Sequence, residues 1–281
     1  MNAARLYLDL LKRSLTNWIY GEQELIPVSP EGLLDPQLLR SLEAWRIVLA
    51  RAGCFDPEQR RQGRDWPPFA HTMIGLKRLD NLQTCIEDVL EKGIPGDLME
   101  TGVWRGGAAI FMRGVLKCYA VEDRVVWAAD SFAGLPPPDP ETYPADNGQN
   151  LHTVSFLAVS LAKVQANFAR YGLLDEQVRF LQGWFRDTLP RAPMKRLAVL
   201  RLDGDLYEST MEALVHLYPK LSVGGYLIVD DYGAVPACRE AVHDFRQAQG
   251  ITEEMVPIDS DSVYWRRTCA NRAVAWCGSS S

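Results

Sequence analysis

Apolar positions divide the chain into a helical first third and a remainder in which short apolar runs alternate with helical segments. Apolar residues recur at helical spacing through residues 3–20, 36–52 and 71–93, which predicts amphipathic helices there. Residues 54–68, CFDPEQRRQGRDWPP, are charged and contain prolines, so they predict a linker or a mobile lid. We therefore expect residues 1–93 to form an N-terminal helical extension with a lid.

From residue 94 onward the pattern is that of an α/β sheet, because apolar runs of strand length alternate with segments of helical spacing. The predicted strands are residues 97–100, 125–129, 178–182, 197–202 and 226–229. The predicted helices are residues 108–119, 154–171, 209–218 and 236–249, and two last runs, 254–258 and 262–266, are expected to be edge strands of antiparallel direction. The alternation predicts a doubly wound, mostly parallel Rossmann-like sheet in a domain of residues 94–281.

Composition and charge narrow the class of partner. The net charge is −6 and no long basic run occurs, which disfavours nucleic acid and anionic membrane surfaces as partners. Six cysteines are scattered without a CxxC pair, so neither a zinc site nor a disulfide framework is indicated, and we expect reduced thiols. The first apolar stretch carries charges, unlike a signal peptide, and no run reaches the length of a membrane span, so we expect a cytoplasmic protein.

Carboxylates follow two of the predicted strands. Asp203 and Asp205 end the run LAVLRLDGD, and Asp230 and Asp231 end the run YLIVDD. Ligands of open α/β sheets bind outside the carboxyl ends of the strands, so these side chains are expected to converge. Like charges repel unless they are neutralised, and a hard divalent cation such as Mg²⁺ does this with oxygen ligands. The alternative is that the aspartates only cap the helices that follow.

A glycine turn follows the first predicted strand. Residues 98–107, LMETGVWRGG, predict a strand, a turn that lets the backbone approach a ligand, and a helix start. A dinucleotide site would need GxGxxG, but Trp104 stands at the second glycine. Asp130 ends the next strand, where an acid binds ribose hydroxyls in nucleoside-binding folds. Gly183 and Trp184 follow the third strand, at a place suited to adenine.

Taken together, several blocks of the chain resemble the macrocin O-methyltransferase family. These blocks are GDLMETGVWRGG, AADSFAGLP, GLLDEQVRFLQGWFRDTLP, LRLDGDLYEST, GGYLIVDDYG and CREAVHDF, and the resemblance covers about residues 60–250. The turn spacing ExGxxxGG is similar to the first motif of S-adenosylmethionine (SAM) dependent methyltransferases. Members of the family use SAM and a divalent metal to methylate hydroxyls of deoxysugars on antibiotics. Within it, the chain looks most similar to enzymes that 4-O-methylate the noviose of aminocoumarins.

The resemblance implies a set of site residues and partners. It implies that Asp203, Asp230 and Asp231 hold Mg²⁺ and that Asp205 is the general base. It further implies that the cofactor SAM contacts Glu100, Thr101, Gly102, Gly106, Asp130, Ser131 and Gly183. The expected partners are a small glycosylated substrate and further copies of the chain, as a dimer or tetramer. Residues 54–71 and 135–149 are candidate lids.

Other interpretations stay open at this point. His152 competes with Asp205 for the role of base. A catechol or other phenolic diol would serve the same chemistry, since a vicinal diol can also chelate a metal ion. An NAD-dependent dehydrogenase is disfavoured by the missing GxGxxG. A non-catalytic nucleoside-binding or scaffold protein would leave the four strand-end aspartates without a task.

Overall fold

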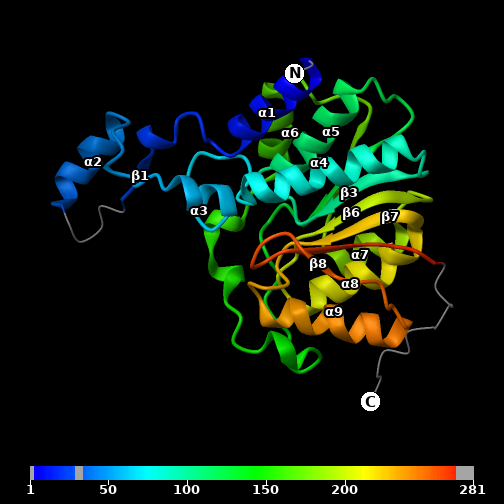
Figure 1. Ribbon diagram of the computed structural model, residues 1–281. Helices are drawn as coiled ribbons and strands as arrows, with labels where there is room; N and C mark the ends of the chain where they lie inside the picture. Colours follow the sequence, from blue (N-terminus) through cyan, green and yellow to red (C-terminus); the bar gives the residue numbers. More distant parts are fainter. Residues whose placement is uncertain (1–2, 29–33, 270–281) are drawn as a thin grey trace.

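One seven-stranded sheet forms the centre of the molecule, in a computed structural model that describes residues 3–28 and 34–269 (Figure 1). Its strands are β3 (Asp97–Thr101), β4 (Val126–Asp130), β5 (Val178–Gln182), β6 (Leu197–Leu202), β7 (Leu221–Val229), β8 (Val256–Pro257) and β9 (Val263–Arg266). They lie in the order β5-β4-β3-β6-β7-β9-β8, and β3 to β7 are parallel. The chain order reverses between β3 and β6, which is where open sheets bind ligands.

The mostly parallel sheet was correctly predicted, but one of its outer strands was misplaced. We expected residues 254–258 and 262–266 to be edge strands. Instead β9 lies inside the sheet, antiparallel to β7 on one side and to β8 on the other, so that only β8 is an edge. Trp265 of β9 is fully buried and packs against Tyr218, so β9 is part of the apolar core on one face of the sheet.

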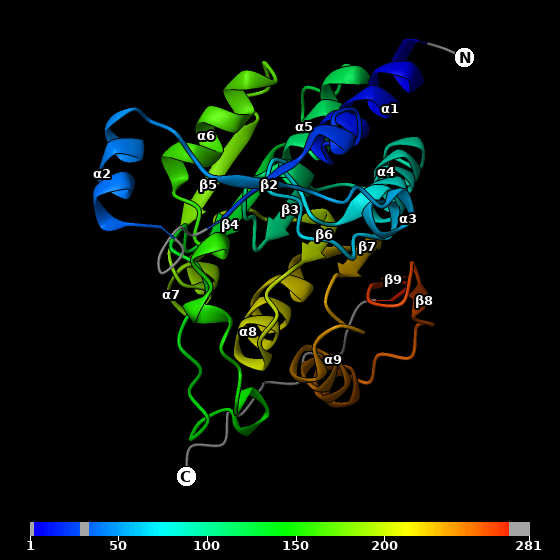
Figure 2. The ribbon, with the colours of Figure 1, turned by 90° about the vertical axis from the view of Figure 1, so that its left-hand side faces the viewer.

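Helices cover both faces of the sheet in a three-layer arrangement (Figure 2). One face carries α1 (Ala3–Leu15), α4 (Gly75–Glu91), α5 (Gly107–Cys118) and α6 (Leu161–Arg170), and the other carries α7 (Phe185–Thr188), α8 (Tyr207–Leu217) and α9 (Pro236–Gln249). Successive strand residues point to opposite faces, so that Leu98 joins one apolar core and Met99 the other. Leu8 and Leu11 of α1 belong to the same core as Leu98, so this first helix is built into the main body.

An excursion between α1 and α4 projects away from the body (Figure 1). It contains β1 (Leu25–Pro27), α2 (Pro36–Ala44) and β2 (Ala50–Ala52), and the two strands pair antiparallel. The predicted helix over residues 36–52 was therefore wrong beyond Ala44, because Arg46 takes a positive φ of 56° and the chain turns back. No residue of α2 is buried. We call residues 25–28 and 34–52 the arm.

The predicted linker 54–68 contains a short helix, α3 (Pro57–Gln62), and is fixed by one arginine. The buried Arg60 donates to both oxygens of Glu24 at 3.0 and 2.9 Å, to Asp65 at 2.6 Å and to the carbonyl of Thr16 at 2.8 Å. Bidentate pairing of this kind fixes both direction and distance. The segment is therefore anchored to the end of α1 and the base of the arm.

A long connection of residues 131–160 joins β4 to α6, which begins later than the predicted residue 154. Ser160 caps α6 from Leu161, and the preceding residues form short 3₁₀ turns. The 3₁₀ turns of the chain are η1 (Gly21–Gln23), η2 (Pro144–Asp146), η3 (Leu151–Thr153), η4 (Ser155–Leu157), η5 (Leu189–Arg191) and η6 (Tyr218–Lys220). Across residues 3–28 and 34–269, none of the helices has the length and apolarity that crossing a bilayer would require.

Candidate active site

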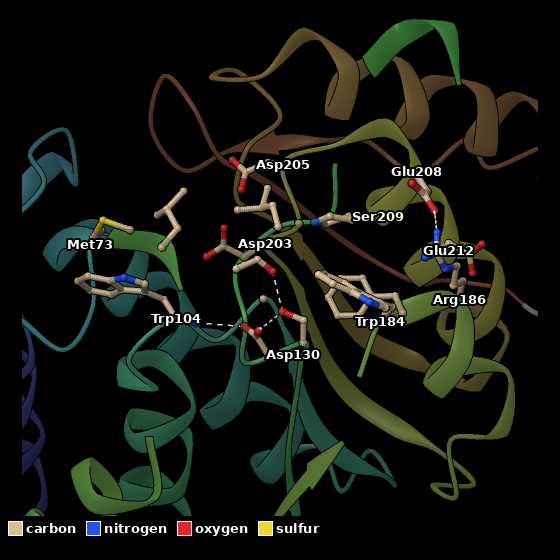
Figure 3. Close-up of a pocket in the computed structure, with 18 residues that line it drawn as sticks. Met73, Trp104, Asp130, Trp184, Arg186, Asp203, Asp205, Glu208, Ser209 and Glu212 are labelled. Atoms are coloured by element: carbon tan, nitrogen blue, oxygen red, sulfur yellow. Dashed lines mark hydrogen bonds and ion pairs between the residues drawn. The ribbon is translucent and has the colours of Figure 1, made fainter. Parts of the chain in front are cut away.

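A cleft of about 810 Å³, including its open mouth, lies at the carboxyl ends of the parallel strands (Figure 3). Every one of the four strands β3 to β6 contributes to its lining through the residues that follow it. These are Gly102 and Trp104 after β3, Asp130 and Ser131 at the end of β4, Trp184 after β5, and Asp203 and Asp205 after β6. Open α/β sheets bind small ligands in a concave site of this kind, outside the carboxyl ends of their strands.

The glycine turn after β3 lies directly against the end of β6. Gly102 has a φ of 79°, and a Cβ built on it would lie 1.5 Å from the carbonyl oxygen of Asp203. Gly106 has a φ of 90° and precedes the first residue of α5. Trp104, between them, holds a φ of 45°, a strained value for a bulky residue. Only glycine fits at position 102, because both the backbone angle and the space exclude a side chain.

Asp130 organises this turn through main-chain hydrogen bonds. One carboxylate oxygen accepts from the N–H groups of Val103 at 2.6 Å and Trp104 at 3.3 Å, and the other accepts from Phe132 at 2.7 Å. Burial raises the pKa of Asp130 above its usual value, although these donors oppose the shift. A carboxylate offers about four acceptor sites. With these three donors, and with the Ser131 hydroxyl 3.3 Å from the oxygen that accepts from Phe132, Asp130 keeps at most one site for a ligand.

The other predicted cofactor residues divide between the lining and the layer behind it. Ser131 belongs to the lining, with Gly102 and Asp130, whereas Glu100, Thr101, Gly106 and Gly183 are not among the described residues that line the cleft. Glu100 is buried, accepting from the Ala109 N–H at 2.9 Å and from Arg201 at 2.6 Å. Burial raises the pKa of Glu100 to about 8. Its contacts make Glu100 a support of the turn.

Three strand-end aspartates converge as the sequence predicted. Asp203, Asp230 and Asp231 each present an oxygen atom, and these atoms all lie within 4.8 Å of one another. Burial, together with neighbouring carboxylates, raises the pKa of Asp203 and raises that of Asp231 well above its usual value. Burial and then the charges of Asp203 and Asp230 raise the pKa of Asp205 to about 7.

The alternative role of these aspartates as helix caps is wrong. The first N–H groups of α8, those of Tyr207 and Glu208, donate to the carboxylate of Asp146 at 2.7 and 3.0 Å. No side chain caps α9, whose N-cap residue is Val235. Asp146 is fully buried and belongs to the 131–160 connection, so this remote residue supplies the cap and fastens the connection to α8.

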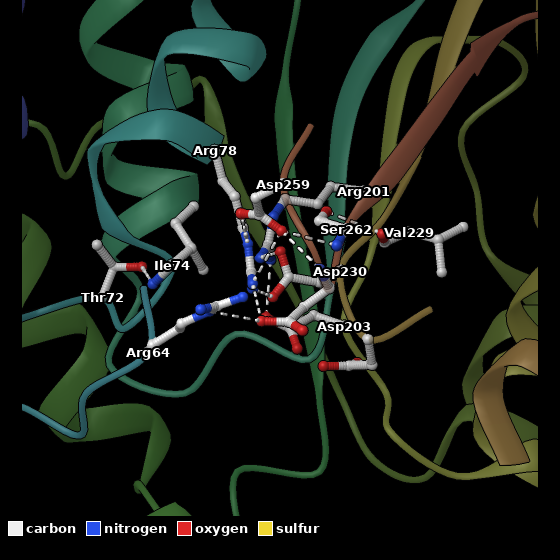
Figure 4. A network of polar contacts seen from close by, with 12 residues as sticks. Arg64, Thr72, Ile74, Arg78, Arg201, Asp203, Val229, Asp230, Asp259 and Ser262 are labelled. Carbon is white, nitrogen blue, oxygen red and sulfur yellow. Dashed lines mark hydrogen bonds and ion pairs between the residues drawn. The ribbon is translucent and has the colours of Figure 1, made fainter. Parts of the chain in front are cut away.

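Two arginines that sequence reasoning missed hold the acidic cluster (Figure 4). Arg201 of β6 is 1% exposed and pairs with Glu100 at 2.6 Å, Asp203 at 2.9 Å and Asp230 at 2.5 Å. Arg78 of α4 pairs with Asp230 at 2.6 Å and with Asp259 at 2.8 Å. Burial acts to raise the pKa of Asp230, but Arg201 and Arg78 outweigh it and lower that pKa.

Arg201 could have been found in the sequence, whereas Arg78 gave no usable signal. Arg201 is the lone charge in a strand of otherwise apolar residues, and a charge buried there must be paired. Arg78 stands in an amphipathic helix, where an arginine is ordinarily solvated.

The donor set fits a hard divalent cation. Five acids, Glu100, Asp203, Asp205, Asp230 and Asp231, are gathered here against the two arginines, and Arg78 is also shared with Asp259 and Asp261. Negative charge therefore exceeds positive charge, and the neighbouring carboxylates add to burial in raising the pKa values of Asp203, Asp205 and Asp231. Carboxylate oxygens are the ligands that Mg²⁺ prefers.

Asp205 reaches the cleft by a route that the sequence did not predict. We expected an extended segment that would put Asp203 and Asp205 on the same side. Instead Asp205 has a φ of 58°, and its N–H donates to Asp231 at 3.1 Å. Asp205 nevertheless lines the cleft, whereas His152 is exposed in η3 and is not part of the described lining.

The first candidate lid segment, 54–71, meets the 131–160 connection above the glycine turn. Trp66 stacks on Phe156 with ring centroids 5.8 Å apart, and the Trp104 indole N–H donates to the Phe156 carbonyl at 2.9 Å. Arg105 donates to the carbonyls of Pro68 at 2.7 Å and Ala70 at 2.8 Å. Phe156 lies beyond the predicted range 135–149 but in the same connection, and together the segments form a roof over the turn.

Comparisons with known proteins agree with this arrangement. A family model described as Macrocin-O-methyltransferase (TylF) matches residues 4–267. The chain is 54% identical over 266 residues to the mycinamicin III 3''-O-methyltransferase of Micromonospora griseorubida, covering 94% of this chain and 96% of the relative. It is 51% identical over 264 residues to the demethyldecarbamoylnovobiocin O-methyltransferase of Streptomyces niveus, covering 94% of each.

A solved structure supports the fold directly. The structure of the O-methyltransferase NovP is 49% identical, covers 95% of this chain and 100% of that chain, and superposes with a TM-score of 0.82. The predicted doubly wound methyltransferase fold is thereby confirmed.

Proposed function

We propose, from the premise that this chain belongs to the macrocin-O-methyltransferase family, that it methylates a hydroxyl of a deoxysugar on an antibiotic or a related secondary metabolite. The observation that carries the proposal is its similarity over nearly the whole chain to O-methyltransferases named for antibiotic substrates. Family membership excludes the NAD-dependent dehydrogenase and the non-catalytic scaffold, since the family is one of methyltransferases.

For the acceptor, we propose a class, the deoxysugars, and no single compound. The two relatives are named for different compounds, mycinamicin III and demethyldecarbamoylnovobiocin, yet their identities to this chain are 54% and 51%. Such a small difference gives no preference for one acceptor. The 4-hydroxyl of a noviose glycoside is therefore one acceptor to test beside others, with a phenolic diol as the alternative class.

For the cofactor, we propose that SAM lies along the carboxyl ends of β3, β4 and β5. Gly102 gives the ligand close access to the backbone, and Asp130 lines the cleft, where its remaining acceptor site would take a ribose hydroxyl. Ser131 lines the same part of the cleft. Glu100, Thr101, Gly106 and Gly183 are proposed to act by shaping the turn and the strand ends beside it.

Asp203, Asp230 and Asp231 would hold Mg²⁺ at the acidic end of the cleft. A bound cation there would supply positive charge that lowers the pKa of a sugar hydroxyl and helps to orient it. Arg201 and Arg78 keep the aspartate side chains in place, since they pair with Asp203 and Asp230.

Asp205 is proposed as the general base. It lines the cleft beside Asp203, and its main-chain N–H is fixed by Asp231. A carboxylate at this position would accept the proton of the attacking hydroxyl as the oxygen–methyl bond forms, while the sulfur–methyl bond of SAM breaks and S-adenosyl-L-homocysteine leaves. Such base catalysis contributes about 10²–10⁴-fold. The roof formed by the two lid segments would keep water from the reaction.

We further propose that the chain self-associates through the arm. Trp45 and Val48 are 70% and 72% exposed, and Leu25, Leu38 and Ile47 are each about half exposed. Apolar side chains gathered on one projecting segment are typical of a protein interface. A second copy of this chain is the partner we propose, to be tested by light scattering; a monomer at micromolar concentration would contradict this part.

The proposed activity is tested by one set of measurements on the purified protein. Calorimetric titration with SAM, with and without Mg²⁺, measures cofactor binding, and methyl transfer is followed with a panel of deoxysugar glycosides and a catechol. We expect SAM to bind without added metal, and turnover of a glycoside to stop with EDTA and return with Mg²⁺. Failure of SAM to bind would contradict the proposal, and turnover unaffected by EDTA would remove the metal from it.

A further inference from the structure

A carboxylate without a full set of partners lies at the far end of the cleft. Glu208, in the first turn of α8, lines the cleft together with Trp184, Phe185, Arg186 and Glu212 (Figure 3). Glu208 is only 7% exposed. Its Oε1 accepts from Arg186 at 3.3 Å, whereas its Oε2 is shielded from solvent and has no hydrogen-bond partner within residues 3–28 and 34–269.

An unpaired buried carboxylate oxygen indicates a missing donor. Burial removes water from the oxygen, and leaving it without a hydrogen bond costs free energy, so native proteins rarely tolerate this without a reason. Burial also raises the pKa of Glu208, and the nearby Glu212 adds to this shift while Arg186 opposes it. A ligand group that donates a hydrogen bond would relieve the cost.

Glu208 is held firmly where it stands. Its main-chain N–H donates to the buried Asp146 at 3.0 Å, and that of Tyr207 donates to the same carboxylate at 2.7 Å. The start of α8 is therefore fixed by the 131–160 connection, which also contributes Leu135, Pro136 and Leu157 to the lining. A side chain carried on such a fixed turn is preorganised for a ligand.

The position of Glu208 identifies the part of the ligand that it can meet. With the ribose at Asp130, the base of the cofactor would lie along the lining toward Trp184 after β5, and the contact between Arg186 and Glu208 brings the first turn of α8 beside that part of the cleft. On the adenine side of the ribose, the 6-amino group is the only hydrogen-bond donor of SAM. Arg186 offers donors only and cannot accept from an amine.

We propose that Glu208 selects the adenine base by accepting a hydrogen bond from its 6-amino group at Oε2. This inference rests on the proposed function, since it takes SAM as the cofactor. Glu208 then acts as a specificity-determining residue of the cofactor site, and its carboxylate rejects a base that presents a carbonyl oxygen at the same place.

The test compares two ligands that differ at this group. S-adenosyl-L-homocysteine carries the 6-amino group, and S-inosyl-L-homocysteine carries a 6-oxo group instead. Calorimetry on the full chain should give an affinity for the inosyl compound weaker by about 10–100-fold, because one charge-assisted hydrogen bond is lost and two oxygens face each other. In Glu208→Gln the ratio should shrink to within about threefold, since an amide can accept from the amine or donate to the carbonyl.

Two control variants make the result specific. Glu176→Gln changes an exposed glutamate outside the cleft and should leave both affinities unchanged. Glu212→Gln changes the neighbouring acid of the lining and should keep the preference for the adenine compound. If Glu212→Gln removes the preference and Glu208→Gln does not, the assignment is overturned. Melting curves with and without ligand confirm that each variant is folded.

Failure of this inference and failure of the proposed function give different results. If the unsubstituted protein binds neither compound, the SAM-dependent activity is wrong. If it binds both equally, the activity stands and the role of Glu208 is overturned without recourse to any variant. If Glu208→Gln leaves the ratio unchanged but raises the KM of the sugar acceptor, Glu208 contacts the acceptor instead and the inference is again overturned.

Discussion

The two halves of the cleft hold their carboxylates by different means. In the cofactor half, Asp130 is fixed by main-chain N–H groups of Val103, Trp104 and Phe132. In the acidic half, Asp203 and Asp230 are fixed by the guanidinium groups of Arg201 and Arg78. In both halves the buried carboxylates have hydrogen-bond donors, but only in the acidic half are those donors positively charged side chains.

This difference predicts different responses to ions and to mutation. Main-chain dipoles are part of the folded backbone, so the cofactor half needs no counter-ion to hold its shape. Buried ion pairs lose solvation on folding, and removing one member leaves a charge without compensation. We therefore expect the acidic half to depend on cations and on its arginines, and the cofactor half to depend on backbone geometry.

The largest effect is expected where the two halves touch. Gly102→Ala places a Cβ against the Asp203 carbonyl, at 1.5 Å in the present geometry, with a φ of 79°. We expect a loss of stability of about 4–5 kcal/mol or more, measured by urea denaturation. Gly172→Ala is the matched control, because its φ is 64° but nothing lies within 4 Å, and it should cost only about 1–2 kcal/mol. Equal costs would show that the contact between the halves is unimportant.

The next largest loss of stability is expected when the ionic support of the acidic half is removed. Arg201→Met removes the partner of Glu100, Asp203 and Asp230 while keeping a long apolar side chain. We expect destabilisation by about 3–5 kcal/mol in denaturant unfolding, with partial recovery on adding Mg²⁺. Arg13→Met, which breaks the exposed pair with Asp9, should cost under about 1 kcal/mol. A cost for Arg201→Met as small as this control would contradict the ionic account.

Two aspartate-to-asparagine substitutions, one in each half, test whether the halves have separate roles. Asp203→Asn should lower metal-dependent turnover by at least about tenfold and leave SAM affinity nearly unchanged, because it changes a proposed metal ligand that also pairs with Arg201 but keeps the main-chain contact with Gly102. Asp130→Asn should weaken SAM binding by about 10–100-fold, since charge-assisted hydrogen bonds to the ribose are lost. Calorimetry and turnover assays measure both. If each variant impaired both properties equally, the halves would form one site without separate roles.

The smallest effect concerns the junction of the first lid segment with the cofactor half. His71 pairs with the Tyr171 hydroxyl at 2.7 Å, and burial, followed by the charges of Arg105, Arg170 and Lys163, lowers its pKa to about 4. The unfolded chain binds the proton more readily between pH 6.5 and 4. His71 therefore stabilises the fold above pH 6.5, and this contribution is lost as the pH falls toward 4.

The measurement is the melting temperature between pH 7 and pH 5. Because His71 is partly exposed, we expect its share of the lost stability to stay under about 1 kcal/mol. His71→Gln should flatten the decline by that share. An identical decline in the variant would assign the pH dependence to other groups.

Sequence reasoning succeeded where local pattern and sheet topology act together. Strands β5 and β6 and helix α9 have the predicted bounds, because apolar runs and helical periodicity are strongest there. The convergence of Asp203, Asp230 and Asp231 followed from parallel strands ending at one edge. Each of these predictions needed only information carried by neighbouring residues.

The failures share a physical cause, which is dependence on partners far away in the sequence. Asp146 stands 61 and 62 positions from the main-chain groups that it accepts from, and Arg78 stands 152 positions from Asp230. The return of the arm at residues 50–52 depends on pairing with β1. The spacing of apolar residues along a short stretch of sequence carries no information about such distant contacts. The helical spacing therefore extended the predicted helix past Ala44.

The close approach of Gly102 to Asp203 has a consequence for re-engineering the enzyme. This contact joins the glycine turn to the end of β6 and leaves no room for a side chain at position 102, so the backbone beneath the cleft is a poor place to redesign for new acceptors. The roof is made of residues 54–71 and 131–160, and hydrogen bonds of Arg105 to Pro68 and Ala70 and of Trp104 to Phe156 join it to the glycine turn. Exchanging roof segments between relatives, while keeping Asp146 as the fastening, is the route to altered acceptor range that leaves methyl transfer intact.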